Sequence, residues 1–341
     1  MGTLHCWQYI QSIQNVVIPE GLCLQVLSVA GRHGEPALAT SVFEALSNLG
    51  VTYREHHFLP LIEAYVRAGD FRQAFIVLSI MRESCLTPPQ LSTLHFLVTA
   101  ISASPVVLDE TFFILQDLVL KEGKRIDITA FNALLQGCIR LNDASRAVST
   151  YREAVPLKVT PNLETFNILL HAANVVGHPQ LAMYILKELK QAQVTPNQDT
   201  YARVILTFLS VRGPEYDQAF LYLEEMKKAG WIPASGVYAT FVKKCVYHND
   251  DRAWAVVEEM KRCGYRTKEL EDYIRNAERN DARDPRMKRG EVKMDAYARR
   301  KEVQQTEDMF RQIIPSGKAP NEGEIADAGI EQQEPAMIEN R

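Results

Sequence analysis

The chain has 341 residues, of which 46% are hydrophobic and 23% charged, and its formal net charge is -4. This composition is typical of a folded protein and excludes the collagen-like, disulfide-scaffold and wholly disordered classes. The net charge excludes a strongly basic nucleic-acid binder but allows a local basic stripe. Residues 269–341 hold 17 acidic and 13 basic side chains, so this segment carries the whole excess of negative charge.

The amino-terminal residues 1–19 contain neither lysine nor arginine. They therefore match neither a basic mitochondrial presequence nor a secretory signal peptide, and we predict a short cap segment. Residues 84–108 lack basic side chains and are largely apolar but contain three prolines. We predict a buried helix there, and no membrane span in the chain.

Residues 20–268 repeat with a period of about 35 residues, which is the strongest signal in the sequence. Three corresponding segment ends mark the period: Val159-Thr160-Pro161-Asn162, Val194-Thr195-Pro196-Asn197 and Trp231-Ile232-Pro233-Ala234. In this phase the array divides into seven copies: 20–54, 55–89, 90–127, 128–162, 163–197, 198–234 and 235–268.

Each copy is predicted to fold as a helix–turn–helix unit. An aromatic residue recurs at the fourth position and a small alanine in the second helix, both of which we interpret as core residues. Gly69, Asn142 and Gly177 lie where the first helix must turn, because both residue types tolerate a positive φ. One helix pair cannot bury its own apolar faces, whereas stacked pairs share a continuous core.

Two segments follow the array. Residues 269–314 are predicted to be a charged helical extension, whose first part closes the array with a polar face. Residues 315–341 are rich in Pro, Gly, Asn, Glu and Gln, and we predict a disordered tail there.

The cysteines and histidines are scattered along the chain. No two of the six cysteines form a CxxC pair, so we expect buried thiols in a reducing compartment. His56 and His57 are adjacent, but neighbours on a helix point in different directions, which suits a metal ion poorly. We therefore predict no metal site and no cofactor.

The repeated pattern [FY]-N-x-L-L, followed by Ala, Glu-Glu-Met and Thr-Pro-Asn, resembles the pentatricopeptide repeat (PPR) of the P type. The resemblance covers about 20–268 and is most specific in copies 128–162 and 163–197. It implies an all-α, right-handed α-solenoid of about seven helix–turn–helix repeats. It also implies a concave groove that binds single-stranded RNA with one base per repeat.

The resemblance assigns base selection to the fifth and last positions of a repeat, which pairs Asn132 with Asn162 and Asn167 with Asn197. Two consecutive Asn pairs resemble pyrimidine readers, and a carboxamide can both donate and accept hydrogen bonds. Asn162 and Asn197 have an alternative role as caps of the helix that follows. Asn132 and Asn167 lie within a helix, where Asn is not favoured, and this favours a functional role.

Charged residues recur at two further positions. Arg32, Arg67 and Arg140 occupy position 13, where the resemblance implies a phosphate contact; the alternative is that they complement the carboxyl end of a helix. Glu164 and Asp199 occupy position 2, where an acid would repel a phosphate backbone. The outer copies lack recognisable base-reading pairs, so readout is expected in about two central repeats.

The sequence contains no hydrolase, zincin, P-loop or dinucleotide motif, so we expect no enzymatic activity. The resemblance implies non-catalytic RNA binding in organellar transcript stability, processing or translation. A mitochondrial location follows from the resemblance, with a mitoribosome or another complex as a partner, if the true amino terminus lies upstream of Met1. The alternative is a protein-binding helical scaffold or assembly factor of a larger complex.

Overall fold

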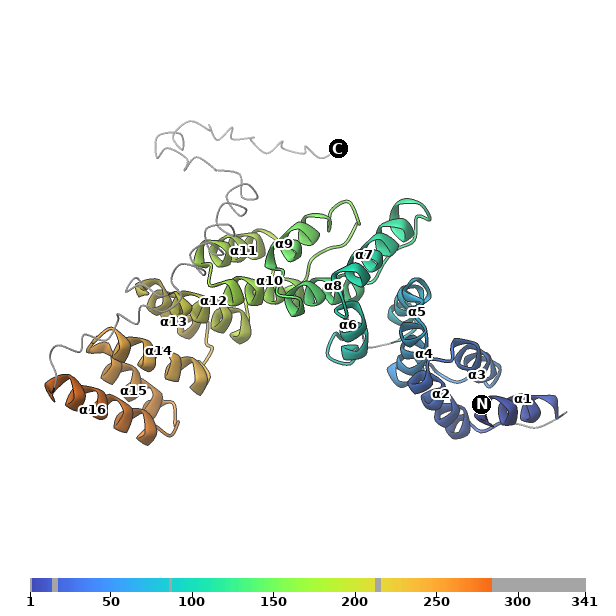
Figure 1. Cartoon of the computed structure of the whole chain (residues 1–341), viewed down its shortest axis with the longest axis horizontal. Coiled ribbons are helices and arrows are strands. Elements are labelled where there is room, and N and C mark those ends of the chain that lie inside the picture. Colours follow the sequence, from blue (N-terminus) through green and yellow to red (C-terminus); the bar gives the residue numbers. More distant parts are fainter. Residues whose placement is uncertain (1, 14–17, 86–87, 212–215, 284–341) are drawn as a thin grey trace, which may run out of the picture. The chain divides into compact units, whose positions relative to one another are not determined.

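The computed structural model describes residues 2–13, 18–85, 88–211 and 216–283, and every regular element in these ranges is an α-helix (Figure 1). The expected all-α class is confirmed. The helices are α1 Gly2–Ser12, α2 Glu20–His33, α3 Pro36–Asn48, α4 Glu55–Arg67, α5 Phe71–Ser84, α6 His95–Ile101, α7 Pro105–Leu120, α8 Ile128–Arg140, α9 Ala144–Arg152, α10 Leu163–Val176, α11 Pro179–Gln191, α12 Gln198–Ser210, α13 Asp217–Lys228, α14 Ser235–Tyr247, α15 Arg252–Arg262 and α16 Lys268–Arg283.

The helices from α2 to α15 form seven consecutive pairs, and one pair lies in each predicted copy. The first helix of a pair packs against its own second helix and against the first helix of the next pair, as α8 does with α9 and α10. This nearest-neighbour packing is that of a solenoid. Helix α16 packs on α14 and α15 at the end of the described part of the chain. Residues 284–314 of the predicted extension and the predicted tail 315–341 lie outside the described residues.

The core consists of the residues that recur with the period. The aromatic residues at the fourth position are at most 5% exposed: Phe58, Phe131, Phe166, Tyr201 and Tyr238. The alanines of the second helices are at most 3% exposed: Ala39, Ala74, Ala147, Ala182, Ala219 and Ala253. A methyl side chain at these points lets two helices approach closely, and the large rings fill the space between successive pairs.

The turns inside the pairs follow from local chemistry. Gly69, Asn142 and Gly177 have φ values of 81°, 56° and 67°, the left-handed conformation that ends a helix. The carboxylate of Asp143 then accepts a hydrogen bond from the backbone N–H of Arg146 at 2.9 Å and caps α9.

The single buried helix predicted over residues 84–108 is wrong. Helix α5 ends at Ser84, α6 is a short helix, and α7 begins at Pro105, whose fixed φ suits the first turn of a new helix. Within the described ranges, no single helix is long and apolar enough to cross a bilayer. Helices α6 and α7 meet that test only together, and they are bent by 112°.

The expectation of buried thiols is correct for three of the six cysteines. Cys23, Cys138 and Cys245 are buried, Cys85 is half-buried, and Cys6 and Cys263 are exposed. Burial raises the pKa of Cys138 to about 12 and that of Cys245 to about 11, so both thiols are protonated at neutral pH.

Candidate nucleic-acid interface

The asparagines at the ends of two copies cap the helices that follow them. The Asn162 side chain accepts a hydrogen bond from the backbone N–H of Thr165, and the Asn197 side chain accepts one from Thr200, both at 2.9 Å. Asn162 therefore caps α10 and Asn197 caps α12. Since the cap uses Oδ1, the Nδ2 group of each asparagine is left free to donate elsewhere.

The asparagines inside the helices lie against these caps. The Nδ2 atom of Asn132 donates to Asn162 Oδ1 at 3.2 Å, and Nδ2 of Asn167 donates to Asn197 Oδ1 at 3.4 Å. The structure thus brings together the two pairs that were expected from the sequence. We call them the Asn132–Asn162 pair and the Asn167–Asn197 pair.

A threonine that the sequence interpretation did not single out orients each pair. The Thr165 hydroxyl lies 2.7 Å from Asn132 Oδ1, and the Thr200 hydroxyl lies 2.7 Å from Asn167 Oδ1. Each threonine stands three residues after a capping asparagine, which is capping-box spacing and could have been recognised in the sequence. Because the threonine hydroxyl donates to Oδ1 of each helical asparagine, the amide nitrogen of that asparagine faces its capping asparagine.

The two pairs differ in accessibility. Asn132 is 0% exposed, and its Nδ2 also donates to Glu164 Oε2 at 3.1 Å, so both of its amide hydrogens are used. Asn167 is half-buried, and its second amide hydrogen has no partner among the described residues. Asp199, which corresponds to Glu164, pairs with Arg203 at 2.8 Å instead.

An open hollow of about 570 Å³ lies along the amino-terminal turns of α10 and α12, and we call it the α10–α12 hollow. Its lining combines the half-buried apolar side chain of Leu163 with the free amide groups of Asn167 and Asn197. Arg203 supplies a guanidinium group at the same place, where its charge is balanced by Asp199, and the Glu164 carboxylate also lines the hollow. Apolar contact, amide donors and one cation together suit a planar heterocycle attached to an anionic backbone.

The recurring arginines lie outside the α10–α12 hollow. Arg32, Arg67 and Arg140 are exposed, and each stands in the last turn of its helix, which supports the alternative of dipole complementation. Arg67 pairs with Glu63 of its own helix at 2.8 Å, and Arg140 donates to Thr99 Oγ1 of α6, in the preceding pair, at 2.8 Å. Their proposed phosphate contacts remain a prediction.

An ion pair with a buried carboxylate joins α5 to α8, and the sequence interpretation missed it. Asp127 is 3% exposed and caps α8 through a 2.7 Å hydrogen bond from the backbone N–H of Thr129. The Arg82 guanidinium donates to both oxygens of the Asp127 carboxylate. Asp127, the last residue of copy 90–127, therefore pairs with a residue of the preceding copy.

His56 and His57 do not diverge as expected, because their ring centroids lie 4.1 Å apart. His57 bends back at the start of α4, where its Nδ1 accepts a hydrogen bond from the backbone N–H of Arg54 at 3.0 Å. Its proton is then on Nε2, which lies 3.1 Å from Glu20 Oε1. The ligand atoms of Glu20, His56 and His57 lie within 4.8 Å of one another, so the structure gathers the two histidines that were expected to point apart.

Two family models match the chain. One, described as pentatricopeptide repeat-containing protein, covers residues 20–154, and the other, described as pentatricopeptide repeat domain, covers residues 149–210. A mitochondrial pentatricopeptide repeat-containing protein of Arabidopsis thaliana is 28% identical over 57% of this chain and 32% of its own length. The small ribosomal subunit protein mS39 of Xenopus laevis is 26% identical over 32% of this chain and 17% of its own length.

Further relatives and solved structures are similar to this chain at lower sequence identity. The mitochondrial 15S rRNA processing factor CCM1 of Yarrowia lipolytica is 24% identical over 43% of this chain and 20% of its own length. The maize protein PPR10 matches 89% of this chain and 40% of its own at 18% identity and a TM-score of 0.46. PPR10 in complex with an 18-nt psaJ RNA element gives 21% identity, 77% and 38% coverage and a TM-score of 0.45. The chain spans about a third or less of the length of these curated relatives.

Proposed function

Because the chain belongs to the pentatricopeptide repeat family, we propose that it binds single-stranded RNA, without catalysing a reaction, as a P-type repeat array. The observation that carries this proposal is the Asn167–Asn197 pair in the α10–α12 hollow. Both residues present unused amide hydrogens there, beside the half-buried side chain of Leu163 and the guanidinium of Arg203.

The free groups of the pair favour a particular base edge. Oδ1 of Asn197 accepts three hydrogen bonds and Oδ1 of Asn167 accepts one from Thr200, so the unused groups of the pair are mainly amide donors. Two donors match the adjacent acceptors N3 and O2 of cytosine, whereas uracil has a donor at N3. We therefore propose that the pair reads a pyrimidine and prefers cytosine.

The names of the relatives support a proposal on the compartment and process in which the protein acts. Two of them are named as mitochondrial and one as a small ribosomal subunit protein, and the factor of Yarrowia lipolytica is named for 15S rRNA processing. We propose a mitochondrial protein that acts on transcript stability, processing or translation, with the mitoribosome as a candidate partner. A solenoid that holds a short RNA segment would block nucleases or keep a start site unpaired.

Fluorescence anisotropy of the full chain with single-stranded RNAs of about 12 nucleotides tests this proposal. Salt would be varied between about 50 and about 200 mM, because each phosphate contact steepens the salt dependence of binding. Binding that falls with salt and is tighter for a cytosine-containing RNA than for oligoadenylate supports the function. No binding at the lowest salt would contradict it.

Replacing Arg203 by glutamine should weaken RNA binding and lower the salt slope by about 0.7. The reason is that one cation leaves the hollow and the Asp199 charge is left without its partner. Arg67→Gln is the matched control, since Arg67 is also paired with an acid four residues away but does not line the hollow. An equal loss in both variants would instead support the phosphate role predicted for position 13.

A second function, docking of a protein, is favoured by the outer face of α7. Val106, Phe113 and Leu120 are 63%, 59% and 59% exposed and follow one another at intervals of seven residues. This spacing forms one apolar stripe along a helix. Such a stripe is typical of a surface that another helix covers.

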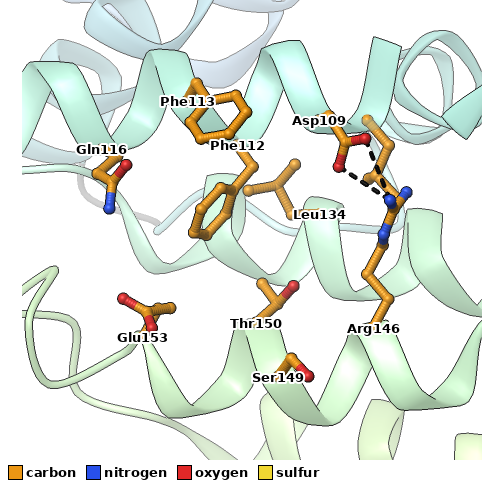
Figure 2. A pocket seen from close by; sticks show the side chains of 10 residues that line it. Asp109, Phe112, Phe113, Gln116, Leu134, Arg146, Ser149, Thr150 and Glu153 are labelled. Carbon is orange, nitrogen blue, oxygen red and sulfur yellow. Dashed lines mark hydrogen bonds and ion pairs between the residues drawn. The ribbon is translucent and has the colours of Figure 1, made fainter. Parts of the chain in front are cut away.

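A pocket of about 340 Å³ between α7 and α9 adjoins the stripe (Figure 2). Phe112 and Leu134 line it, the Asp109–Arg146 ion pair at 3.0 Å closes one end, and Glu153 lies at the other end. Glu153 has no ion-pair partner among the described residues. The occupant we propose is therefore a helix of a partner protein with apolar residues at heptad spacing and a basic residue opposite Glu153.

Replacing Phe113 by aspartate should abolish binding of a synthetic helical peptide that has leucines at heptad spacing and flanking lysines. A charged residue in the centre of the stripe prevents apolar contact, and it leaves the α10–α12 hollow unchanged. Isothermal titration calorimetry would measure the peptide affinity, and a peptide with glutamates in place of lysines is the control. Equal affinity of the two peptides, or of the two proteins, would contradict docking.

A further inference from the structure

We propose that Glu164 closes the Asn132–Asn162 pair, so that this junction does not read a base although its two asparagines match those of the next junction. The proposal rests on the RNA-binding function above. It makes Glu164 a specificity-determining residue: the array selects one base at the Asn167–Asn197 pair and is indifferent to the base that precedes it.

The hydrogen bonds of Asn132 leave nothing for a base. Its Oδ1 accepts from Thr165, and its two amide hydrogens go to Asn162 Oδ1 and Glu164 Oε2. The residue has no exposed surface. A base edge could approach Asn132 only if the Glu164 side chain left, and the amide would then exchange a charge-assisted hydrogen bond for a neutral one.

The sequence around the two acids explains why only one of them closes its junction. The residue four positions after Asp199 is Arg203, on the same face of α12, and it holds the Asp199 carboxylate at 2.8 Å. The residue four positions after Glu164 is Ile168, which offers no charge. The longer glutamate side chain therefore reaches across to the amide of Asn132.

The carboxylate also opposes RNA at this junction through its charge. Carboxylate oxygens only accept hydrogen bonds, so they face the acceptors N3 and O2 of a cytosine without a proton between them. The phosphate backbone is repelled as well. Occlusion and charge thus both oppose RNA binding at this junction, and substitution of Glu164 can separate their effects.

Full-length chains with Glu164→Ala, Glu164→Gln and Asp199→Ala would be compared with the natural chain by fluorescence anisotropy. The probes are oligoadenylates of about 12 nucleotides that contain no cytosine, one central cytosine or two adjacent cytosines. The natural chain should prefer one cytosine to none and gain little from the second. Glu164→Ala should gain about tenfold in affinity from the second cytosine, because the Asn132–Asn162 pair is then open.

The two other variants separate opening from loss of charge. Glu164→Gln keeps an oxygen that accepts from Asn132, so it should bind every probe more tightly without responding to the second cytosine. Asp199→Ala removes the corresponding acid and should likewise give no response to the second cytosine. Circular dichroism melting would establish that each variant is folded.

The results that would overturn the role of Glu164 differ from the result that would overturn RNA binding itself. The proposal is overturned if the natural chain already gains about tenfold from the second cytosine. It is also overturned if Glu164→Ala prefers one cytosine to none but gains nothing from two. If the natural chain binds none of the probes at low salt, the RNA-binding function itself fails, and the proposal fails with it.

Discussion

The Asn167→Ala variant is expected to bind a cytosine-containing RNA about tenfold more weakly than the natural chain, with no preference left between cytosine and adenine. The substitution removes an amide donor from the α10–α12 hollow and one of the two acceptors of the Thr200 hydroxyl. Anisotropy with the probe containing one cytosine measures the affinity, and the oligoadenylate without cytosine measures the selectivity.

Asn132→Ala is the matched control, because Asn132 has the same position in the preceding copy and the same threonine contact. Its amide is buried and used by Asn162 and Glu164, so the variant should keep its preference for cytosine. It should instead lose about 1–3 kcal/mol of folding stability, since the hydrogen bonds of a buried side chain to Asn162, Glu164 and Thr165 are lost. An equal loss of selectivity in both variants would show that the two pairs act alike.

Replacing Arg82 by glutamine is expected to lower the free energy of unfolding by about 3 kcal/mol, the largest stability effect that we expect from a surface-reaching side chain. The Asp127 carboxylate is fully buried, and without Arg82 it keeps only its capping hydrogen bonds. Urea denaturation followed by circular dichroism measures the change. Removal of one partner is costly because the other charge remains buried and unpaired.

Arg72→Gln provides the comparison, since Arg72 lies on the same helix and pairs with Glu122, whose side chain is 31% exposed. An ion pair that water reaches should contribute at most about 1 kcal/mol. The double variant Arg82→Gln, Asp127→Asn should recover part of the lost stability, because it removes the unpaired charge and keeps a capping side chain. Equal losses from Arg82→Gln and Arg72→Gln would contradict a structural role of the buried carboxylate.

The helical pairs and their core could be predicted because they depend on local periodicity. A repeated aromatic residue such as Phe131 in the first helix and a repeated alanine such as Ala147 in the second recur at fixed positions in most copies, and stacked copies bury these positions. The helix ends could be predicted for a similar reason, because Gly, Asn and Asp act within one turn of the backbone. The long element expected over residues 84–108 was wrong, since Pro105 starts a new helix there.

The sequence by itself determined the repeat phase and the helix pairs, because both depend on spacing along the chain. The partnership of the asparagines was implied by the resemblance to the pentatricopeptide repeat. Only the tertiary structure decided which partnership is accessible. Asn132 and Asn167 hold the same position in their repeats, but the free space beside each depends on whether Glu164 or Asp199 reaches it. The ion pair between Asp127 and Arg82 likewise joins residues that are 45 positions apart, so no local sequence pattern reveals it. Long side chains choose their partners from everything that folding brings near them, and that choice determines which part of a repeated surface can bind.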